Sequence, residues 1–182
     1  MKQNHIKKEN YIKINQISAR CMRVIALVIL LFFVYCYFNV EVDRTLLVIF
    51  FATAIFIALV PTLVINVFKF DSSPVTKYIV LFCICIICTI MLTLLSSFSF
   101  PIMIFPILIA SLYYNQTFVL FASLLMSCSI FASNYLSFKY KAYFVGNYFE
   151  DFNDVLTGYV IPHIILVFSM SVVAYFIVQR NS

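Results

Sequence analysis

Residues 78–138 form a stretch of 61 residues that contains no Asp, Glu, Lys or Arg. A transmembrane helix needs about 20 consecutive apolar residues to cross the hydrocarbon core of a bilayer. A helix on the surface of a soluble protein would carry a polar face, and the apolar segments here carry none. They also lack the alternation of polar and apolar residues that a transmembrane β-barrel requires. The stretch therefore predicts about three membrane-spanning helices joined by short turns.

The composition extends this prediction to the whole chain. Apolar residues make up 64% of the 182 residues and charged residues 10%, against about 45–50% and about 25% in soluble domains. These proportions exclude an ordinary soluble enzyme, a disordered tail and a basic nucleic-acid-binding domain. We expect an all-α fold, a polytopic helical membrane bundle of about six transmembrane helices. The six expected spans are Arg23–Asn39, Leu46–Phe68, Tyr78–Leu95, Ile102–Tyr114, Thr117–Leu136 and Val160–Val178.

The fourth expected span, Ile102–Tyr114, is the shortest of the six and contains Pro106. Proline lacks a backbone N–H and kinks a helix that contains it. The segment is therefore either a kinked full crossing or a re-entrant hairpin, and a hairpin would have to be buried against neighbouring helices. We expect the full crossing.

Lys and Arg near the ends of the spans set the orientation of a membrane protein. Five cations precede the first span: Lys2, Lys7, Lys8, Lys13 and Arg20. Residues 1–22 are therefore expected to form a basic cytoplasmic tail. Six crossings place both termini in the cytoplasm, with a six-helix transmembrane domain over residues 23–180 and an aromatic outer loop over residues 137–158. We expect an uncleaved signal anchor, because no cleavage site of small residues follows the first span.

The formal net charge of +5 comes from the first 23 residues, because the charges of the remainder cancel. A polybasic segment beside a membrane attracts anionic lipids, and Ile14, Ile17 and Cys21 have the spacing of a short interfacial helix. We favour the simpler interpretation, in which these cations only fix the orientation. The expected partner is the lipid bilayer, and no nucleic-acid partner is expected.

Six cysteines suggest redox or metal chemistry, and Cys85 and Cys88 form a C-x-x-C pair. Metal ligation needs thiolates, which apolar surroundings disfavour. Neither a second pair nor a histidine cluster completes a zinc site. In an apolar helix cysteine behaves as a small apolar residue, so we expect a packing role, no metal and no cofactor.

Polar residues inside or beside the spans are the candidates for function. The expected ligand-binding residues, which would share the outer mouth of the bundle if the fifth and sixth spans are neighbours, are Asn134, Tyr135, Tyr159 and His163. The alternative for His163 is a neutral imidazole that is hydrogen-bonded to a backbone carbonyl near Pro162. The motifs G-x-x-x-x-G-K-[ST], H-E-x-x-H and G-x-S-x-G are absent, so no catalytic residue is assigned.

Two segments carry a resemblance to a known group of proteins. They are the run FPILIASLYYN at residues 105–115 and the last span, from YVIPH at residues 159–163 to IVQR at residues 177–180. Together with the basic tail and six spans, they resemble the N-terminal membrane region of bacterial signalling proteins. In these proteins six helices precede a cytoplasmic diguanylate cyclase, histidine kinase or HD-type phosphodiesterase module.

The resemblance implies a sensory or input domain in a bacterial cell membrane, with a cytoplasmic N-terminus. It also implies an output module, which the 182 residues do not contain, so any enzymatic activity would belong to a longer parent protein such as a diguanylate cyclase or histidine kinase. We further expect a homodimer through the membrane domain. The alternative function is a small-molecule transporter subunit, similar to the six-helix substrate-binding component of a vitamin uptake system. Paired broken helices at corresponding positions would favour that alternative.

Overall fold

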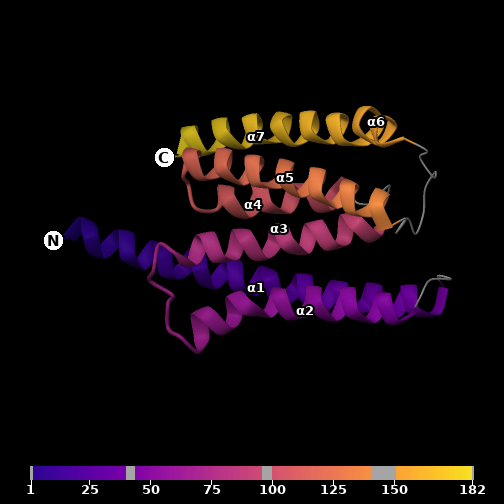
Figure 1. Cartoon of the computed structure of the whole chain (residues 1–182). Helices are drawn as coiled ribbons and strands as arrows, with labels where there is room; N and C mark the ends of the chain where they lie inside the picture. The colour runs from indigo at the N-terminus through magenta and orange to yellow at the C-terminus, as the bar shows by residue number, and fades with distance from the viewer. Residues whose placement is uncertain (1, 40–43, 96–99, 141–150, 182) are drawn as a thin grey trace. The chain divides into compact units, whose positions relative to one another are not determined.

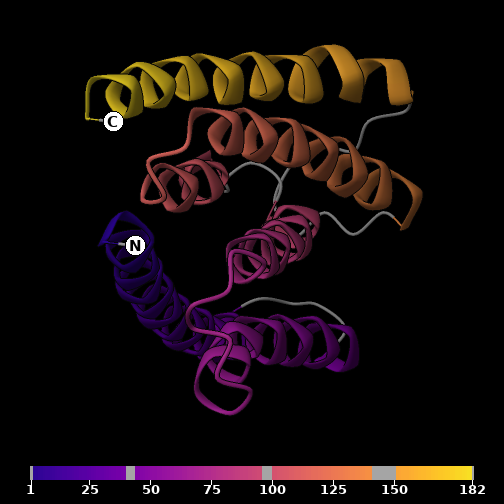
Figure 2. The ribbon, with the colours of Figure 1, turned by 90° about the vertical axis from the view of Figure 1, so that its left-hand side faces the viewer.

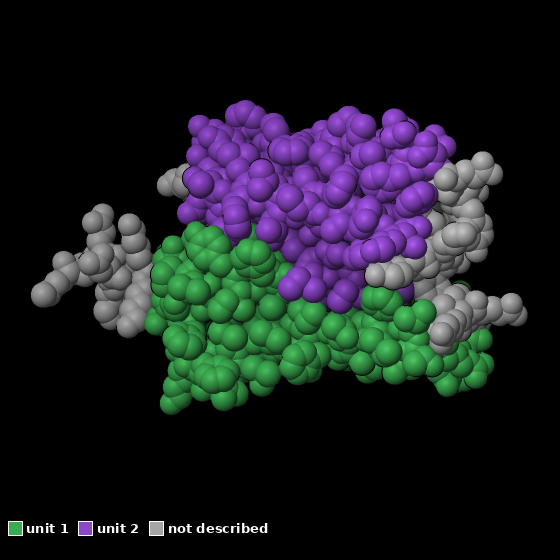
Figure 3. All heavy atoms as spheres, viewed as in Figure 1, with its two compact units in different colours: residues 1–84 green, residues 85–182 purple. Residues whose placement is uncertain are grey.

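The computed structural model describes residues 2–39, 44–95, 100–140 and 151–181 (Figure 1). Within these ranges the regular secondary structure is helical. Five of the helices are long and apolar enough to cross a membrane, which is the character of a multi-pass membrane protein. The contacts within the chain gather in two compact units, residues 1–84 and 85–182 (Figure 3). The boundary falls inside helix α3, Thr76–Leu95.

Unit 1 is built on two antiparallel helices, α1 (Lys2–Asn39) and α2 (Arg44–Asn66), which lie side by side (Figures 1 and 2). The ring of Phe51 on α2 contacts two rings of α1. Its centroid lies 6.0 Å from that of Phe32 and 5.4 Å from that of Phe33. Aromatic pairs at such distances add to the free energy of burying the rings, so they stabilise this helix pair in its register.

The basic segment that was expected as a tail, residues 1–22, is helical from Lys2 and continues without a break into the apolar part of α1. Its 38 residues give a length of about 57 Å at 1.5 Å per residue. The hydrocarbon core of a bilayer is only about 30 Å thick. A bilayer around the apolar part of α1 would therefore leave the basic end of the helix outside the hydrocarbon.

Asn15 fastens this basic end of α1 to the loop between α2 and α3. Its side-chain amide is completely buried and donates hydrogen bonds to the carbonyl oxygens of Asp71, at 2.6 Å, and Ser73, at 3.4 Å. The hydroxyl of Thr76, at the start of α3, donates to the carbonyl oxygen of Phe70 at 2.5 Å. These bonds satisfy loop carbonyls that have no helical partner, and they fix the rotation of α1 about its own axis.

Unit 2 is organised around α5 (Gln116–Tyr140), which lies beside both α4 (Phe105–Ser111) and α7 (Ile161–Asn181) (Figure 2). One face of α5 is fully buried, with its residues three or four apart as on one side of a helix. These residues are Val119, Ala122, Met126, Ile130 and Ser133. Ala122 and Ser133 are small, whereas Val119, Met126 and Ile130 fill the space between α5 and its neighbours.

The hydroxyl of Ser137, one turn beyond this stripe, donates to the carbonyl oxygen of Thr93 at 2.8 Å. Both residues are buried. The bond joins the C-terminal end of α5 to the C-terminal end of α3, inside unit 2. The C-terminal ends of α3 and α5 therefore lie together at one end of α5, and Gln116 begins α5 at its other end.

The fourth expected span, Ile102–Tyr114, is the main correction to the sequence analysis. The structure has a 3₁₀ helix, η1 (Phe100–Ile104), followed by the short helix α4 (Phe105–Ser111). Together they extend about 20 Å, less than the roughly 30 Å of a hydrocarbon core. Pro106 lies in the first turn of α4, where its missing N–H costs no hydrogen bond. It therefore begins a helix and does not kink one.

The interhelical segment expected over residues 137–158 is shorter in the structure. Helix α5 continues to Tyr140, and the chain is helical again in α6 (Phe152–Val155) and η2 (Leu156–Val160). Asp151 caps α6, because its carboxylate accepts a hydrogen bond from the backbone N–H of Asn153. Residues 141–150 of the expected loop lie outside the described residues.

Replacing Asn15 by Ala should destabilise the protein by about 1–3 kcal/mol, because the loop carbonyls lose their buried donor. The change can be measured as the shift in free energy of unfolding in a denaturing-detergent titration followed by helical circular dichroism. Gln16→Ala is the matched control, since Gln16 is exposed on the next position of α1. Equal effects of the two substitutions would contradict the role of Asn15.

Candidate functional site at the α5 and α7 helices

The four expected site residues lie on two neighbouring elements of unit 2. Asn134 and Tyr135 are on the last turns of α5, Tyr159 is in η2 and His163 is in the first turn of α7. Helix α5 contacts both η2 and α7, so the two pairs belong to adjacent elements. What each side chain does there differs from residue to residue.

Tyr135 belongs to an aromatic cluster that forms where α6 meets α5. The ring of Phe152 lies 6.1 Å from that of Phe131, 5.8 Å from that of Tyr135 and 5.4 Å from that of Phe138, centroid to centroid. We call these four residues the Phe152 cluster. The first two contacts are edge-on, an arrangement that aromatic rings prefer. The cluster anchors α6, and with it the start of the last helix, on α5.

Asn134 is directed toward its own helix. Its side-chain amide donates to the carbonyl oxygen of Ile130, one turn earlier, at 2.8 Å. This bond occupies one of the two N–H groups of the amide. The contribution of Asn134 to a ligand site is therefore restricted to its remaining N–H and its carbonyl oxygen.

Tyr159 and His163 are in contact with each other. The Nδ1 atom of His163 lies 2.6 Å from the carbonyl oxygen of Tyr159, and the two rings are 6.1 Å apart. A carbonyl oxygen can only accept, so Nδ1 must carry a proton. In the neutral imidazole, Nε2 then holds a lone pair on a ring that is only half-buried. This atom can accept a hydrogen bond from a ligand.

A π-helical turn lies directly before His163. In η2 the backbone N–H of Ile161 donates to the carbonyl oxygen of Leu156, five residues earlier. Pro162 follows and has no N–H to donate, so the hydrogen-bond ladder is interrupted at this point. Single π-helical turns are rare and often occur at functional sites. The sequence did not predict this turn, and Pro162 close after Gly158 is the only signal that could have suggested it.

Gly158 lies inside the π-helical turn without being needed for close packing. A Cβ atom added at this position would have nothing within 4 Å. Glycine in a helix costs about 1 kcal/mol relative to alanine, and here no crowding in the described structure offsets that cost. The glycine therefore adds conformational freedom to the turn that precedes α7.

The Cys85 and Cys88 pair is part of the core of unit 2. Both thiols are buried, and the Cys88 thiol lies 3.5 Å from the carbonyl oxygen of Ile102, to which it can donate. Among the described residues, no group of three or more His, Cys, Asp or Glu could hold a metal ion. The pair therefore has the surroundings of packing residues.

The chain matches no protein-family model, no curated protein and no solved structure. Its candidate site is therefore described by its own geometry alone.

We predict that Cys85 and Cys88 resist a maleimide reagent in the folded protein and react only after denaturation, because both are buried. Single-cysteine variants that retain Cys85, Cys88 or the partly exposed Cys21 can be compared by mass spectrometry. Cys21 should react at least about tenfold faster than either buried thiol. Equal rates in the folded protein would show that the pair is accessible and would contradict a packing role.

Proposed function

We propose that this chain is the membrane-embedded input domain of a bacterial signal-transduction protein, which passes a signal through α7 to a cytoplasmic output module. The observation that carries the proposal is the packing of α7. It belongs to the span Phe152–Arg180, which is the least buried of the five candidate spans. A helix held by little burial can change its position at a small cost in free energy.

The buried contacts of this span lie along a narrow seam. From Val160 onward its fully buried residues are Val160, Val167, Ser171 and Val178, which are seven, four and seven residues apart. This spacing is close to the 3.5-residue repeat of a coiled-coil seam. Small and β-branched side chains form the seam, so rotation or sliding of α7 would not require a large core to be repacked. Such small helix shifts are a known mode of signal transmission in proteins.

The π-helical turn Leu156–Val160 supplies a device that could drive the shift. Converting a π turn to an α turn moves the following helix by one residue, about 1.5 Å along its axis and about 100° around it. His163 lies three residues after the end of this turn, in the first turn of α7, and its Nε2 atom can accept a hydrogen bond from a ligand. A ligand that bound better to one form of the turn would shift the population of both forms.

The proposed orientation has both termini in the cytoplasm. Within unit 2 the end of α3 is joined to the end of α5, whereas α4 leads into the start of α5 through a short turn. The chain between α3 and α5 must therefore travel the length of α5, and η1 and α4 supply most of a sixth passage. Lys13, Arg20 and Arg23 support a cytoplasmic position for the basic end of α1, because cytoplasmic segments carry an excess of Lys and Arg.

We also propose that the domain is a homodimer, with α7 at the contact. An exposed apolar stripe runs along α7 beside the seam, and it consists of Ile161, Ile165, Phe168, Val172 and Phe176. These residues repeat at intervals of three or four and form one continuous stripe. A second copy would bring two α7 helices together, and paired helices can transmit a shift to two output modules at once.

A reporter fusion tests the proposal. With a cytoplasmic kinase fused after residue 182, Ser171→Leu should change the output several-fold, because Ser171 is fully buried in the seam. Ser169→Leu is the matched control. Ser169 is exposed and, like Ser171, bonds to the carbonyl oxygen four residues earlier, so its replacement should leave the output within about twofold.

His163→Phe, which removes Nε2, should abolish any response to an added ligand. Unchanged output in both Ser171→Leu and His163→Phe, with expression and helicity as in the parent fusion, would contradict the input-domain proposal. Tight ligand binding in detergent together with unchanged output would support the transporter alternative.

A further inference from the structure

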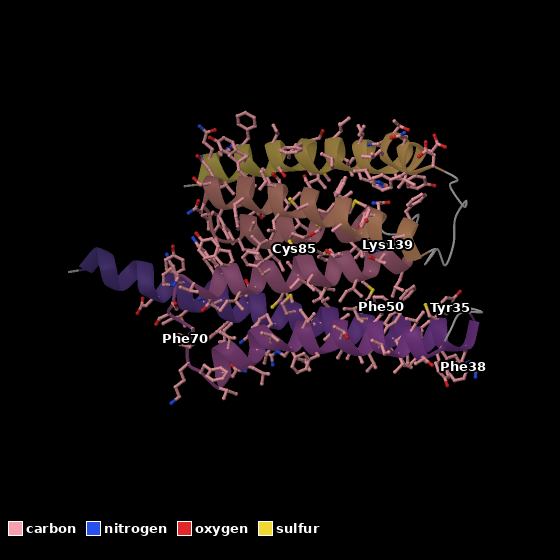
Figure 4. All side chains as sticks on the ribbon, in the orientation of Figure 1. Tyr35, Phe38, Phe50, Phe70, Cys85 and Lys139 are labelled. Atoms are coloured by element: carbon pink, nitrogen blue, oxygen red, sulfur yellow. The ribbon has the colours of Figure 1, made fainter. Side chains whose placement is uncertain are left out.

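One face of α1 is exposed along its length and changes character at Arg23. From Val24 to Phe38 the exposed side chains are apolar or aromatic, and they include Tyr35 (Figure 4). Toward the N-terminus the same face carries the exposed residues Lys13, Gln16, Arg20 and Arg23. Their spacing of three and four residues keeps them on one side of the helix. An apolar face suited to lipid therefore continues directly into a cationic one.

The opposite face of α1 is buried, which fixes the direction of the cations. Its buried residues in this region are Asn15, Ser18, Ala19 and Met22. The hydrogen bonds of Asn15 to the α2–α3 loop lock this face in place. The cationic stripe therefore cannot turn toward the interior of unit 1.

Arg20 and Arg23 have no ion pair or other specific partner among the described residues. Arg44, at the other end of the helix pair, does have a partner, because its guanidinium lies 5.3 Å from the ring centre of Tyr37. Arg20 and Arg23 thus keep all their donors available for a ligand outside the protein.

The positions of these cations along the helix match the headgroup layer of a bilayer. Arg23 directly precedes the apolar stripe, and Arg20 lies about 4.5 Å beyond it at 1.5 Å per residue. The polar layer on each side of the hydrocarbon is about 5–8 Å thick. Both guanidinium groups therefore reach the depth of the lipid phosphates, which they can bind through two parallel hydrogen bonds each.

We propose that Arg20 and Arg23 form a binding surface for the phosphate groups of anionic glycerophospholipids. This goes beyond an orientation signal, because it assigns lipid selectivity to named side chains that the fold holds at headgroup depth. The charge of the surface and its continuity with the apolar stripe both match a lipid that is anionic at the headgroup and apolar below it. The inference rests on unit 1 alone and does not depend on the input-domain proposal.

The experiment uses the full chain in nanodiscs that contain equal amounts of phosphatidylglycerol and phosphatidylcholine. After mild detergent extraction, the ratio of the two lipids retained on the protein is measured by mass spectrometry. The parent chain should retain phosphatidylglycerol preferentially. Arg20→Gln with Arg23→Gln should lower this preference by up to about 25-fold, since each exposed cation contributes a factor of about five near an anionic surface. Lysines at both positions should preserve most of it.

The matched control is Arg44→Gln with Lys139→Gln, which changes the net charge equally but removes cations that already have partners. This variant should retain the preference of the parent chain for phosphatidylglycerol. Adding 1 M salt should weaken the preference of the parent chain, because the Debye length falls to about 3 Å. The proposal is overturned if the parent chain shows no preference. It is also overturned if the control variant loses as much of the preference for phosphatidylglycerol as the Arg20 and Arg23 variant does, while both variants keep the helicity of the parent chain.

Discussion

The structure depends on one constraint, which is that a backbone in hydrocarbon must satisfy its own hydrogen bonds. In a helix the peptide groups satisfy it by bonding to one another. The hydroxyl side chains also find their hydrogen-bond partners within their own helix. Thr89, Ser127 and Ser171 each donate to the carbonyl oxygen four residues earlier. Polar side chains can therefore lie inside apolar helices without a ligand or water. This is why many serines and threonines in the spans indicate packing, and why function must be sought where the helical pattern is broken.

The pattern is broken in a few places, and these carry the proposals. Pro162 has no N–H to donate to the backbone hydrogen bonds of the helix, and a π-helical turn ends shortly before it. The Nδ1–H of His163 donates to the backbone carbonyl oxygen of Tyr159. In α2, Pro61 is followed by Thr62, whose hydroxyl is buried without a partner among the described residues. In α1, the buried Asn15 is used to hold loop carbonyls. At His163 and Asn15 a specific side-chain hydrogen bond is made, and a specific bond can be changed by a ligand or a lipid.

Much of the fold could be predicted from the sequence, because hydropathy reports directly on which residues avoid water. The long helices follow from it. The shortened α4 could not be predicted, since Pro106 is equally compatible with a kink and with a helix start. Asn15 resembled a solvated residue in a basic tail, and only the loop that folds back on it makes it buried. At the candidate site the sequence could not show that α5 and α7 are neighbours, that Asn134 bonds to its own helix or that η2 is a π turn.

The most direct test of α7 as the signalling helix is to remove one residue from the π turn. Deleting Thr157 should convert the turn to a regular α-helix and rotate α7 by about 100° relative to α5. Spin labels at the exposed positions Leu124 and Ser169 allow the distance between the two helices to be measured by pulsed electron paramagnetic resonance, alongside the output of a fused reporter. If α7 transmits a signal, the distance and the output should change together. A changed distance with unchanged output would contradict this role, as would an unchanged distance in a folded deletion variant.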